Sequence, residues 1–141
     1  MAMTLALARA LIDGCFAEAA ARGMKPITVA VIDAGGHLVA LARQDGASNL
    51  RAEIAQGKAK GAVAMGLGSR ALHARAEKQP YFLQAMNALN HGALVPVPGG
   101  VLIRQGDALI GAAGITGDSS DNDEACAVAA IEAAGLVADP G

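Results

Sequence analysis

The segment GITGDSSDNDEAC, residues 114–126, gathers more acidic side chains than the start of a helix requires. Asp121 followed by Glu124 fits a capping box, in which both side chains satisfy free N–H groups of the first turn. Asp123 adds a carboxylate where the helix dipole favours negative charge. Residues 118–120 are then left over at a junction between a strand and a helix, a common place for binding sites. The acids would repel a phosphate, so a cation or a hydroxyl-bearing ligand suits this junction better.

Three histidines, His37, His73 and His91, offer further chemistry, but none has a partner at the spacing of a local zinc motif. Each is therefore interpreted first as a hydrogen-bonded structural residue. A site assembled from distant segments or from two subunits stays open. G-x-S-x-G is absent, and the G-x-G-x-x-A match at residues 66–71 follows a helical stretch rather than a strand, which argues against a dinucleotide site.

Basic side chains gather on the helix predicted after residue 50. Arg51, Lys58 and Lys60 lie on this helix, and Arg43 ends the strand before it. A solvated helix face is the ordinary interpretation. The alternative is a cluster that holds a carboxylate, which arginine recognises in bidentate fashion.

The elements that must position these residues follow from hydrophobic periodicity and turn residues. Thr4 caps a first helix that Gly23 ends, and Gly35-Gly36 can form the two-residue turn of a hairpin. The predicted strands are 27–34, 37–43, 101–104 and 108–116, and the predicted helices are 5–22, 50–65, 69–78 and 121–136. Ser69 is expected to cap its helix, and residues 81–90 to hold an irregular turn. Hairpins alternating with helices predict one α+β domain, residues 1–141, with helices packed on an antiparallel sheet.

Composition excludes several classes of protein. The chain has 141 residues, a formal net charge of −2 and no basic block, so no nucleic acid is expected as a partner. No apolar run is long enough for a membrane span, and the N-terminus lacks the basic region of a signal peptide. Cys15 and Cys126 lie on apolar helical stretches, which predicts buried, unbridged thiols and favours the cytoplasm.

Three motifs in order, VIDAGGHLVALARQDGA, VPVPGGVLIRQGDALIGAAGITG and DNDEACAVAAIEA, resemble the GlcG/HbpS-like family. The chain is also similar to the C-terminal domain of PduO-type corrinoid adenosyltransferases. The resemblance implies a profilin-like α+β fold with a five-stranded antiparallel sheet flanked by helices. It also implies self-association into dimers and often octamers. Some members bind haem, and others are encoded beside catabolic genes.

Three functions follow as hypotheses. The first is a small-ligand-binding protein that takes haem or another tetrapyrrole. His37 would be the axial ligand, Leu, Val and Met side chains would form the walls, and Arg43, Arg51 or Lys58 would hold the propionates. The second is an enzyme that acts on a small organic acid or related metabolite. The third is an oligomeric accessory protein without a ligand.

The enzyme hypothesis pairs His37 with Asp123 or Glu124 for proton transfer. Thr116 ends the apolar strand before the acidic segment, so the turn after it lies at one end of the sheet. If the start of the His37 strand lies at the same end, the acidic segment and the glycine hairpin form one polar site. Strand pairing decides this point.

Overall fold

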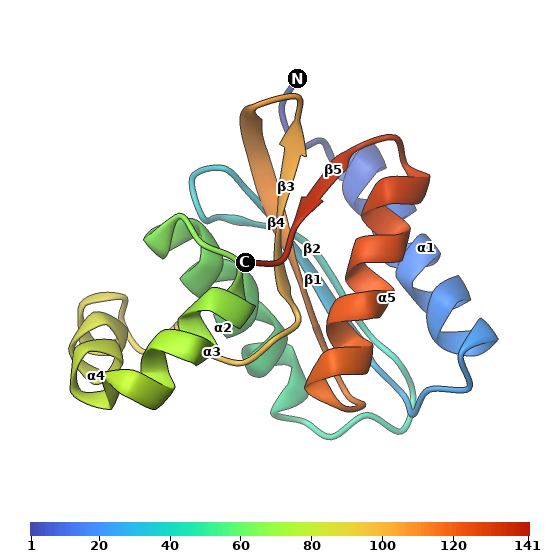
Figure 1. Ribbon diagram of the computed structural model, residues 1–141. Coiled ribbons are helices and arrows are strands. Elements are labelled where there is room, and N and C mark those ends of the chain that lie inside the picture. The colour runs from blue at the N-terminus through green and yellow to red at the C-terminus, as the bar shows by residue number, and fades with distance from the viewer.

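Five helices and five strands make up the computed structural model, which describes residues 1–141 (Figure 1). The strands form one antiparallel sheet in the order β2-β1-β4-β3-β5. The helices are α1 (Leu5–Ala21), α2 (Arg51–Met65), α3 (Ser69–Lys78), α4 (Pro80–Leu89) and α5 (Ser120–Ala133). The strands are β1 (Thr28–Asp33), β2 (Leu38–Arg43), β3 (Gly100–Gln105), β4 (Ala108–Thr116) and β5 (Val137–Asp139). The predicted α+β class with a five-stranded antiparallel sheet is confirmed.

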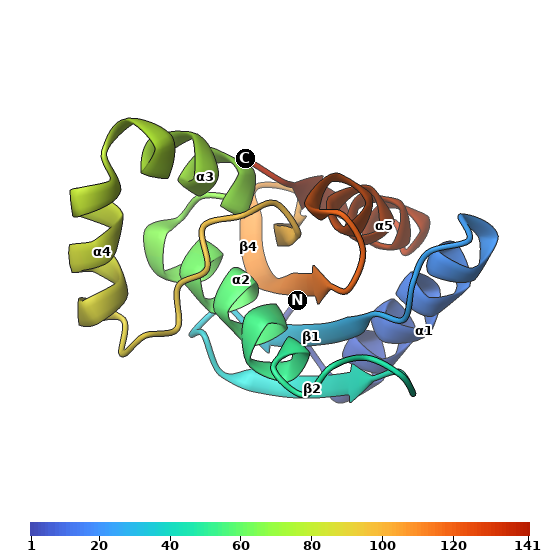
Figure 2. The ribbon, with the colours of Figure 1, turned by 90° about the horizontal axis from the view of Figure 1, so that it is seen from below.

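Helices cover both faces of the sheet. Figure 2 shows α1 and α5 on one side and α2, α3 and α4 on the other. Val29 and Val31 pack with α1 and α5 in the larger core cluster, whereas Ile32 packs with Ala59 and Ala62 of α2. Alternate residues of a strand point to opposite faces, so a nearly continuous apolar strand such as β1 is what a sheet covered on both faces requires.

Small residues let α2 lie directly on the central strand β4. A Cβ at Gly114 would collide with the carbonyl oxygen of Ala55, so the backbones approach as closely as glycine allows. The chain has only three aromatic residues in 141, and close backbone approach takes the place of large side chains in this layer. None of the five helices is long and apolar enough to cross a lipid bilayer.

Most predicted elements are present, with four corrections. Residues 80–89 form a regular helix rather than an irregular turn, because Pro80 occupies the first turn, where its missing N–H is not needed. The final helix ends at Ala133, and the chain turns at Gly135 into β5. Ser119 caps α5 by accepting from the N–H of Asn122, so Asp121 is not the cap. Ser69 accepts from the N–H of Gly100 at 2.7 Å and does not cap α3.

The two cysteines are buried free thiols that meet between α1 and α5. Cys126 Sγ donates to the carbonyl oxygen of Cys15 at 3.1 Å. The hydrogen bond with Cys126, together with burial, raises the pKa of the Cys15 thiol well above its usual value, so this sulfur stays protonated. The two residues contribute to the interior as small apolar groups.

Thr28 and Thr116 provide a matched pair for a stability prediction, since they face each other across β1 and β4 and both are buried. Thr28 Oγ1 has no hydrogen-bond partner, whereas Thr116 Oγ1 accepts from Arg51 Nη1 at 2.8 Å. A buried hydroxyl without a partner costs free energy that valine avoids. We expect Thr28→Val to raise the free energy of unfolding by about 1 kcal/mol and Thr116→Val to lower it by about 1.5 kcal/mol.

Urea denaturation of the two variants and the wild type measures both changes. Equal destabilisation by the two substitutions would show that the Thr28 hydroxyl is satisfied in solution.

Candidate functional site

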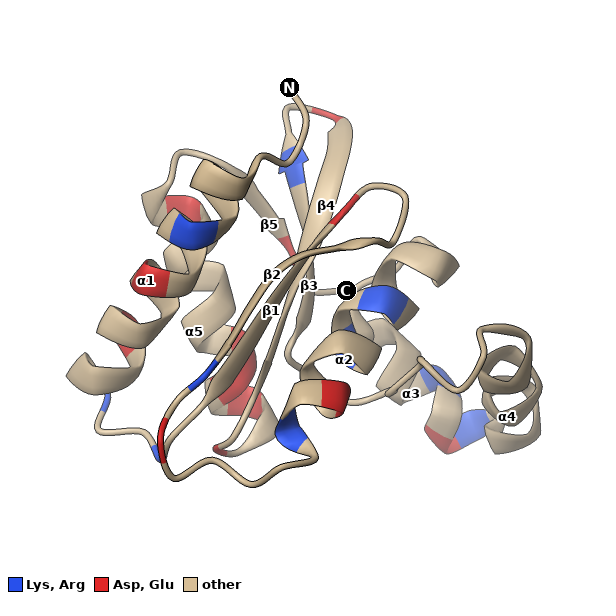
Figure 3. Ribbon diagram, turned by 180° about the vertical axis from the view of Figure 1, so that it is seen from behind, with Lys and Arg blue, Asp and Glu red and all other residues tan.

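The predicted site residues lie at two opposite ends of the sheet. In β1, Thr28 pairs with Arg43 on one side and with Thr116 on the other, whereas Asp33 at the far end pairs with Gly111. The β1–β2 hairpin that carries His37 is therefore remote from the end of β4. Figure 3 shows the charged starts of α2 and α5 together at one end of the sheet and the hairpin at the other. Within one subunit, the hypothesis of one polar site built from His37 and the acidic segment is wrong, because antiparallel pairing separates them.

Lys58 and Asp123 form a buried ion pair at the α5 end. Their side chains are 2% and 1% exposed, and Lys58 Nζ lies 3.3 Å from Asp123 Oδ2. The ammonium also donates to the carbonyl oxygen of Ile115 at 2.8 Å, and Asp123 Oδ1 accepts from the N–H of Asp118. Lys58 belongs to α2 and Asp123 to α5, so this pair joins the layers on opposite faces of the sheet.

Gly99 leaves the space through which the lysine side chain reaches its partner. Its φ of +122° lies in the region that favours glycine, and a Cβ there would lie 2.6 Å from Ile115 O and 2.8 Å from Lys58 Nζ. Glycine at position 99, directly before β3, is thus explained by the buried ion pair beside it.

Burial dominates the electrostatics of both partners. It raises the pKa of Asp123, although the nearby Lys58 ammonium opposes this change. It lowers the pKa of Lys58, although Asp123 opposes that change. The free energy lost when a charge leaves water exceeds the attraction to one opposite charge at this distance. The charged state of each group therefore depends strongly on the presence of the other. The pair is inaccessible to a ligand and acts in the scaffold.

The remaining predicted residues at this end are also engaged by the protein. Arg51 donates to Thr116, and Arg43 Nη1 donates to Asn49 Oδ1 at 2.8 Å. Glu124 accepts from Arg70 Nε at 2.8 Å.

The acidic segment therefore does more than cap a helix, because its carboxylates join three parts of the fold. Asp121 and Glu124 both bind Arg70 of α3, Asp123 binds Lys58 of α2, and Asp118 accepts from the N–H of Lys25 before β1. Arg70 was not predicted from sequence, since a single arginine in the first turn of a short helix carries no distinguishing signal.

Asp33 and His37 form a second pair of polar side chains at the tip of the β1–β2 hairpin. Asp33 Oδ1 accepts from the N–H groups of His37 and Gly35, each at 2.9 Å, and lies 3.2 Å from His37 Nδ1. The hydrogen bond from the His37 N–H contributes most to lowering the pKa of Asp33, which keeps this carboxylate ionised. The His37 side chain is 81% exposed.

A carboxylate beside Nδ1 favours the imidazole tautomer that carries its proton on Nδ1. The lone pair is then on Nε2 of an exposed ring, an arrangement typical of metal-ligating histidines backed by a carboxylate. Asp33 was not singled out from sequence, although its place two residues before Gly35 is the spacing of an Asx turn.

Two hollows flank this hairpin tip and share Gly35 as a wall. One, of about 320 Å³, has mainly hydrophobic walls that include Met1, Met3, Leu109 and Ile110. The other, of about 250 Å³, contains a lysine and a histidine from α2 and from the turn after α4. The His37 ring lies against Gly35, where an added Cβ would come within 2.9 Å of Nδ1. Glycine at position 35 thus gives the imidazole its room beside both hollows.

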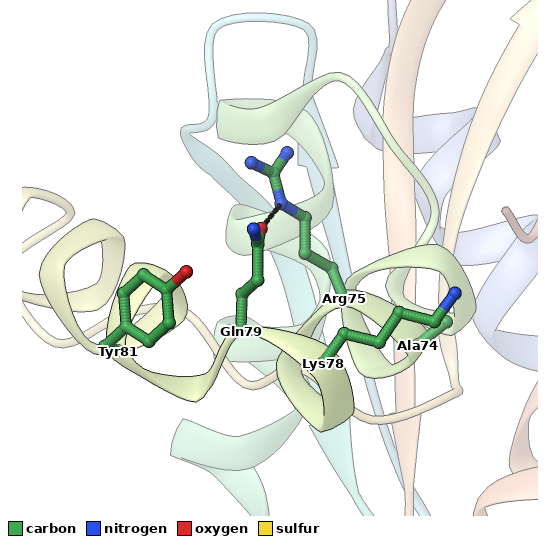
Figure 4. Close-up of a pocket in the computed structure, with 5 residues that line it drawn as sticks. All are labelled: Ala74, Arg75, Lys78, Gln79 and Tyr81. Carbon is green, nitrogen blue, oxygen red and sulfur yellow. Dashed lines mark hydrogen bonds between the residues drawn. The ribbon is translucent and has the colours of Figure 1, made fainter.

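A larger hollow of about 590 Å³ lies at the corner between α3 and α4 (Figure 4). It is a broad surface hollow, and its Arg75 donates to Gln79 Oε1 at 3.2 Å and lies over the ring of Phe82. Figure 4 shows the Tyr81 ring at one side of the hollow and Lys78 at the other. None of the predicted site residues lines this hollow.

The other two histidines differ in their partners. His73 is held at both ring nitrogens, by the carbonyl oxygen of Pro96 and by Glu77. His91 lines the smaller hollow beside the hairpin. The residues do not gather three His, Cys, Asp or Glu side chains into a metal site.

The Lys58–Asp123 pair generates a prediction with a distinct pH signature. Lys58→Met leaves a buried carboxylate without its cation and is expected to lower the free energy of unfolding by about 3–5 kcal/mol at neutral pH. The pKa of Asp123 then rises further above 3.8 in the folded state. The folded variant is most stable when Asp123 is protonated, so its free energy of unfolding falls as the pH rises.

Asp123→Asn has the opposite pH dependence. It leaves a buried ammonium whose pKa falls further below 10.5, so its destabilisation shrinks as the pH rises. Urea denaturation at several pH values measures both slopes. The control is Asp121→Asn, at a side chain 81% exposed, where we expect a change within about 1 kcal/mol. Parallel pH profiles for the two buried variants would contradict the prediction.

Comparison with known proteins places this geometry in a family. The chain is similar to the solved PduOC:heme complex, with 28% identity over 96% of this chain and 97% of that one, and a TM-score of 0.85. It is similar to HbpS, with 25% identity over 94% and 90% of the two chains and a TM-score of 0.80. Klebsiella pneumoniae protein ORFY shares the fold, with 24% identity over 92% and 88% and a TM-score of 0.83.

The sequence matches no curated protein. Residues 3–132 match the model of the family described as haem degrading protein HbpS-like. This match covers nearly the whole chain, so the protein belongs to the HbpS-like family.

Proposed function

We propose that this protein binds a small ligand, haem or another metal-bearing tetrapyrrole, and that His37 is the protein ligand to its metal. The observation that carries the proposal is the His37 imidazole, which is 81% exposed and has the ionised Asp33 carboxylate 3.2 Å from its Nδ1. Family membership and the haem in the PduOC complex support the choice of ligand.

The residues around the hairpin tip meet two of the three requirements of such a group. A haem needs an axial ligand, apolar surface for the macrocycle and partners for its carboxylates. His37 offers the first, and the hollow with Met1, Met3 and Leu109 offers the second. Leu38, next to His37 and 45% exposed, adds apolar surface. The bound iron would supply redox and ligand-exchange chemistry, while the chain holds and orients it.

The propionate role predicted for Arg43, Arg51 and Lys58 does not enter this proposal. These side chains lie at the other end of the sheet and are engaged by Asn49, Thr116 and Asp123. The walls expected to be Leu, Val and Met side chains are supplied here by leucine, isoleucine and methionine.

Haemin titration followed by absorption spectroscopy tests the proposal. We expect wild-type protein to shift the Soret band and His37→Ala to weaken binding at least tenfold and lose the histidine-ligated spectrum. Asp33→Asn should weaken binding by roughly 10–100-fold, the range found when outer-shell partners of metal ligands are removed. The His37 imidazole is intact in Asp33→Asn, so the spectrum of this variant should remain that of a histidine-ligated haem.

Two matched variants serve as controls. His73→Ala removes a histidine engaged by Pro96 and Glu77, and Tyr81→Phe removes the exposed phenol at the α3–α4 corner. Both should titrate like the wild type. If Tyr81→Phe changes the spectrum and His37→Ala does not, the ligand binds at the α3–α4 corner and the His37 assignment is wrong.

We propose further that the chain assembles with copies of itself, first as a dimer and then as an octamer. Large apolar side chains on the surface support this, among them Leu50 at 63%, Leu89 at 73% and Val137 at 49% exposure. The outer edges of β2 and β5 are also unpaired. Light scattering at micromolar concentration should give a mass well above the 14.0 kDa of one chain. A monomer mass would contradict the proposal.

A further inference from the structure

The smaller hollow beside the hairpin tip combines cationic and apolar lining without any acidic side chain. It has a volume of about 250 Å³ and lies where the second half of α2, the β1–β2 hairpin and the turn after α4 meet. Its lining residues are Gly35, Gly36, Lys60, Val63, Ala64, Asn90, His91 and Ala93. We propose that this hollow is a binding site for a short aliphatic carboxylate, with Lys60 and His91 as the partners of its oxygen atoms.

Lys60 is available to a ligand. It is partly buried, and its ammonium makes no hydrogen bond or ion pair within the chain. Lys58, two residues earlier on the same helix, points to the other side and is fully engaged by Asp123 and Ile115. The two lysines of the Lys-Ala-Lys sequence therefore have separate roles, one inside the scaffold and one at the hollow.

His91 is held at the rim by an unusual backbone conformation. It is the only residue other than glycine with a positive φ, at +57°. The turn around it is fixed by Asn90 Nδ2, which donates to Ala93 O, and by the N–H of Gly92, which donates to Asn87 O at 2.8 Å. Backbone strain of this kind gathers at functional sites. The His91 ring has no partner within the chain, unlike those of His37 and His73.

No carboxylate lines the hollow, so Lys60 is the charged side chain on its walls. At the end of α2 the carbonyl oxygens of Ala62 and Val63 accept hydrogen bonds from the N–H groups of Leu67 and Gly66. The negative end of the helix dipole opposes an anion there, and the Lys60 ammonium offsets it. Asp33, in the hairpin, is turned to the N–H groups of the hairpin itself. A bound anion thus meets the Lys60 ammonium without a competing carboxylate on the walls.

The size and walls of the hollow select the class of anion. Val63, Ala64 and Ala93 give apolar surface that suits a few methylene groups, and the lysine and histidine suit a carboxylate. Two sources share this chemistry. One is a free short-chain carboxylate, and the other is a propionate arm of a haem held by His37, whose ring lies against Gly35 of the same hollow. The second source rests on the proposed function, and the first does not.

The free carboxylate is tested by nuclear magnetic resonance with sodium propionate as the probe. In wild-type protein we expect saturable shifts of the His91 ring resonances and none of the His73 ring. Lys60→Met should weaken propionate binding at least fivefold. The matched control Lys25→Met, at an exposed lysine without a side-chain partner, should bind like the wild type. Thermal unfolding of each variant verifies that it is folded.

A second experiment tests the haem propionate as the source of the carboxylate. It compares the binding of haemin with that of its dimethyl ester, in which both propionates are blocked. If the hollow takes a propionate of haem, Lys60→Met weakens haemin binding at least fivefold and leaves binding of the ester unchanged. If Lys60→Met weakens free propionate only, the site serves a separate small acid. Unchanged binding of haemin and of free propionate in Lys60→Met overturns the inference. Loss of ester binding in His37→Ala reports on the haem proposal alone, so the two proposals can fail independently.

Discussion

The ion pair between Lys58 and Asp123 is the constraint on which the arrangement of layers depends. It crosses the end of the sheet and ties α2 on one face to α5 on the other. Both side chains are almost fully buried, so neither charge can recover its hydration if the other moves away. A buried pair of this kind contributes little net stability compared with apolar packing, but separating its partners leaves an uncompensated buried charge, which costs about 3–5 kcal/mol. Gly99 leaves the room it needs.

Further polar contacts close this end of the molecule around the pair. Arg70 brings α3 to the start of α5 through Asp121 and Glu124, and Arg51 binds the last residue of β4, Thr116. The carboxylates that the sequence suggests as a ligand site thus bind basic side chains of the same chain. The opposite end of the sheet has no comparable network, and the Asp33–His37 pair there leaves its imidazole facing solvent.

The two proposed binding features share one short segment. Gly35 and Gly36 allow the tight hairpin, place His37 at its tip and form a wall of the hollow that contains Lys60 and His91. His37, the proposed metal ligand with its carboxylate partner, thus lies at the same end of the sheet as the apolar hollow and the hollow that contains Lys60. Each supplies a different part of what an amphipathic, carboxylate-bearing ligand requires, and none of them is needed by the ion-pair network that stabilises the other end.

Local sequence determined the elements, and long-range pairing decided the site. Thr4, the Gly35-Gly36 turn and the alternation of apolar residues predict α1, the first hairpin and the central strand β4, because these signals depend on near neighbours. The α+β class follows from the order of those elements. The short strand β5 escaped prediction from local sequence because three residues carry no periodicity and are held by pairing with β3.

The sequence could name His37, Lys58 and Asp123 as chemically capable, but not which residues would meet. Antiparallel register placed His37 and Asp123 at opposite ends, and burial turned Lys58 from a candidate ligand into a scaffold residue. Only the folded chain specifies the separation of His37 from Asp123 and the loss of hydration of Lys58.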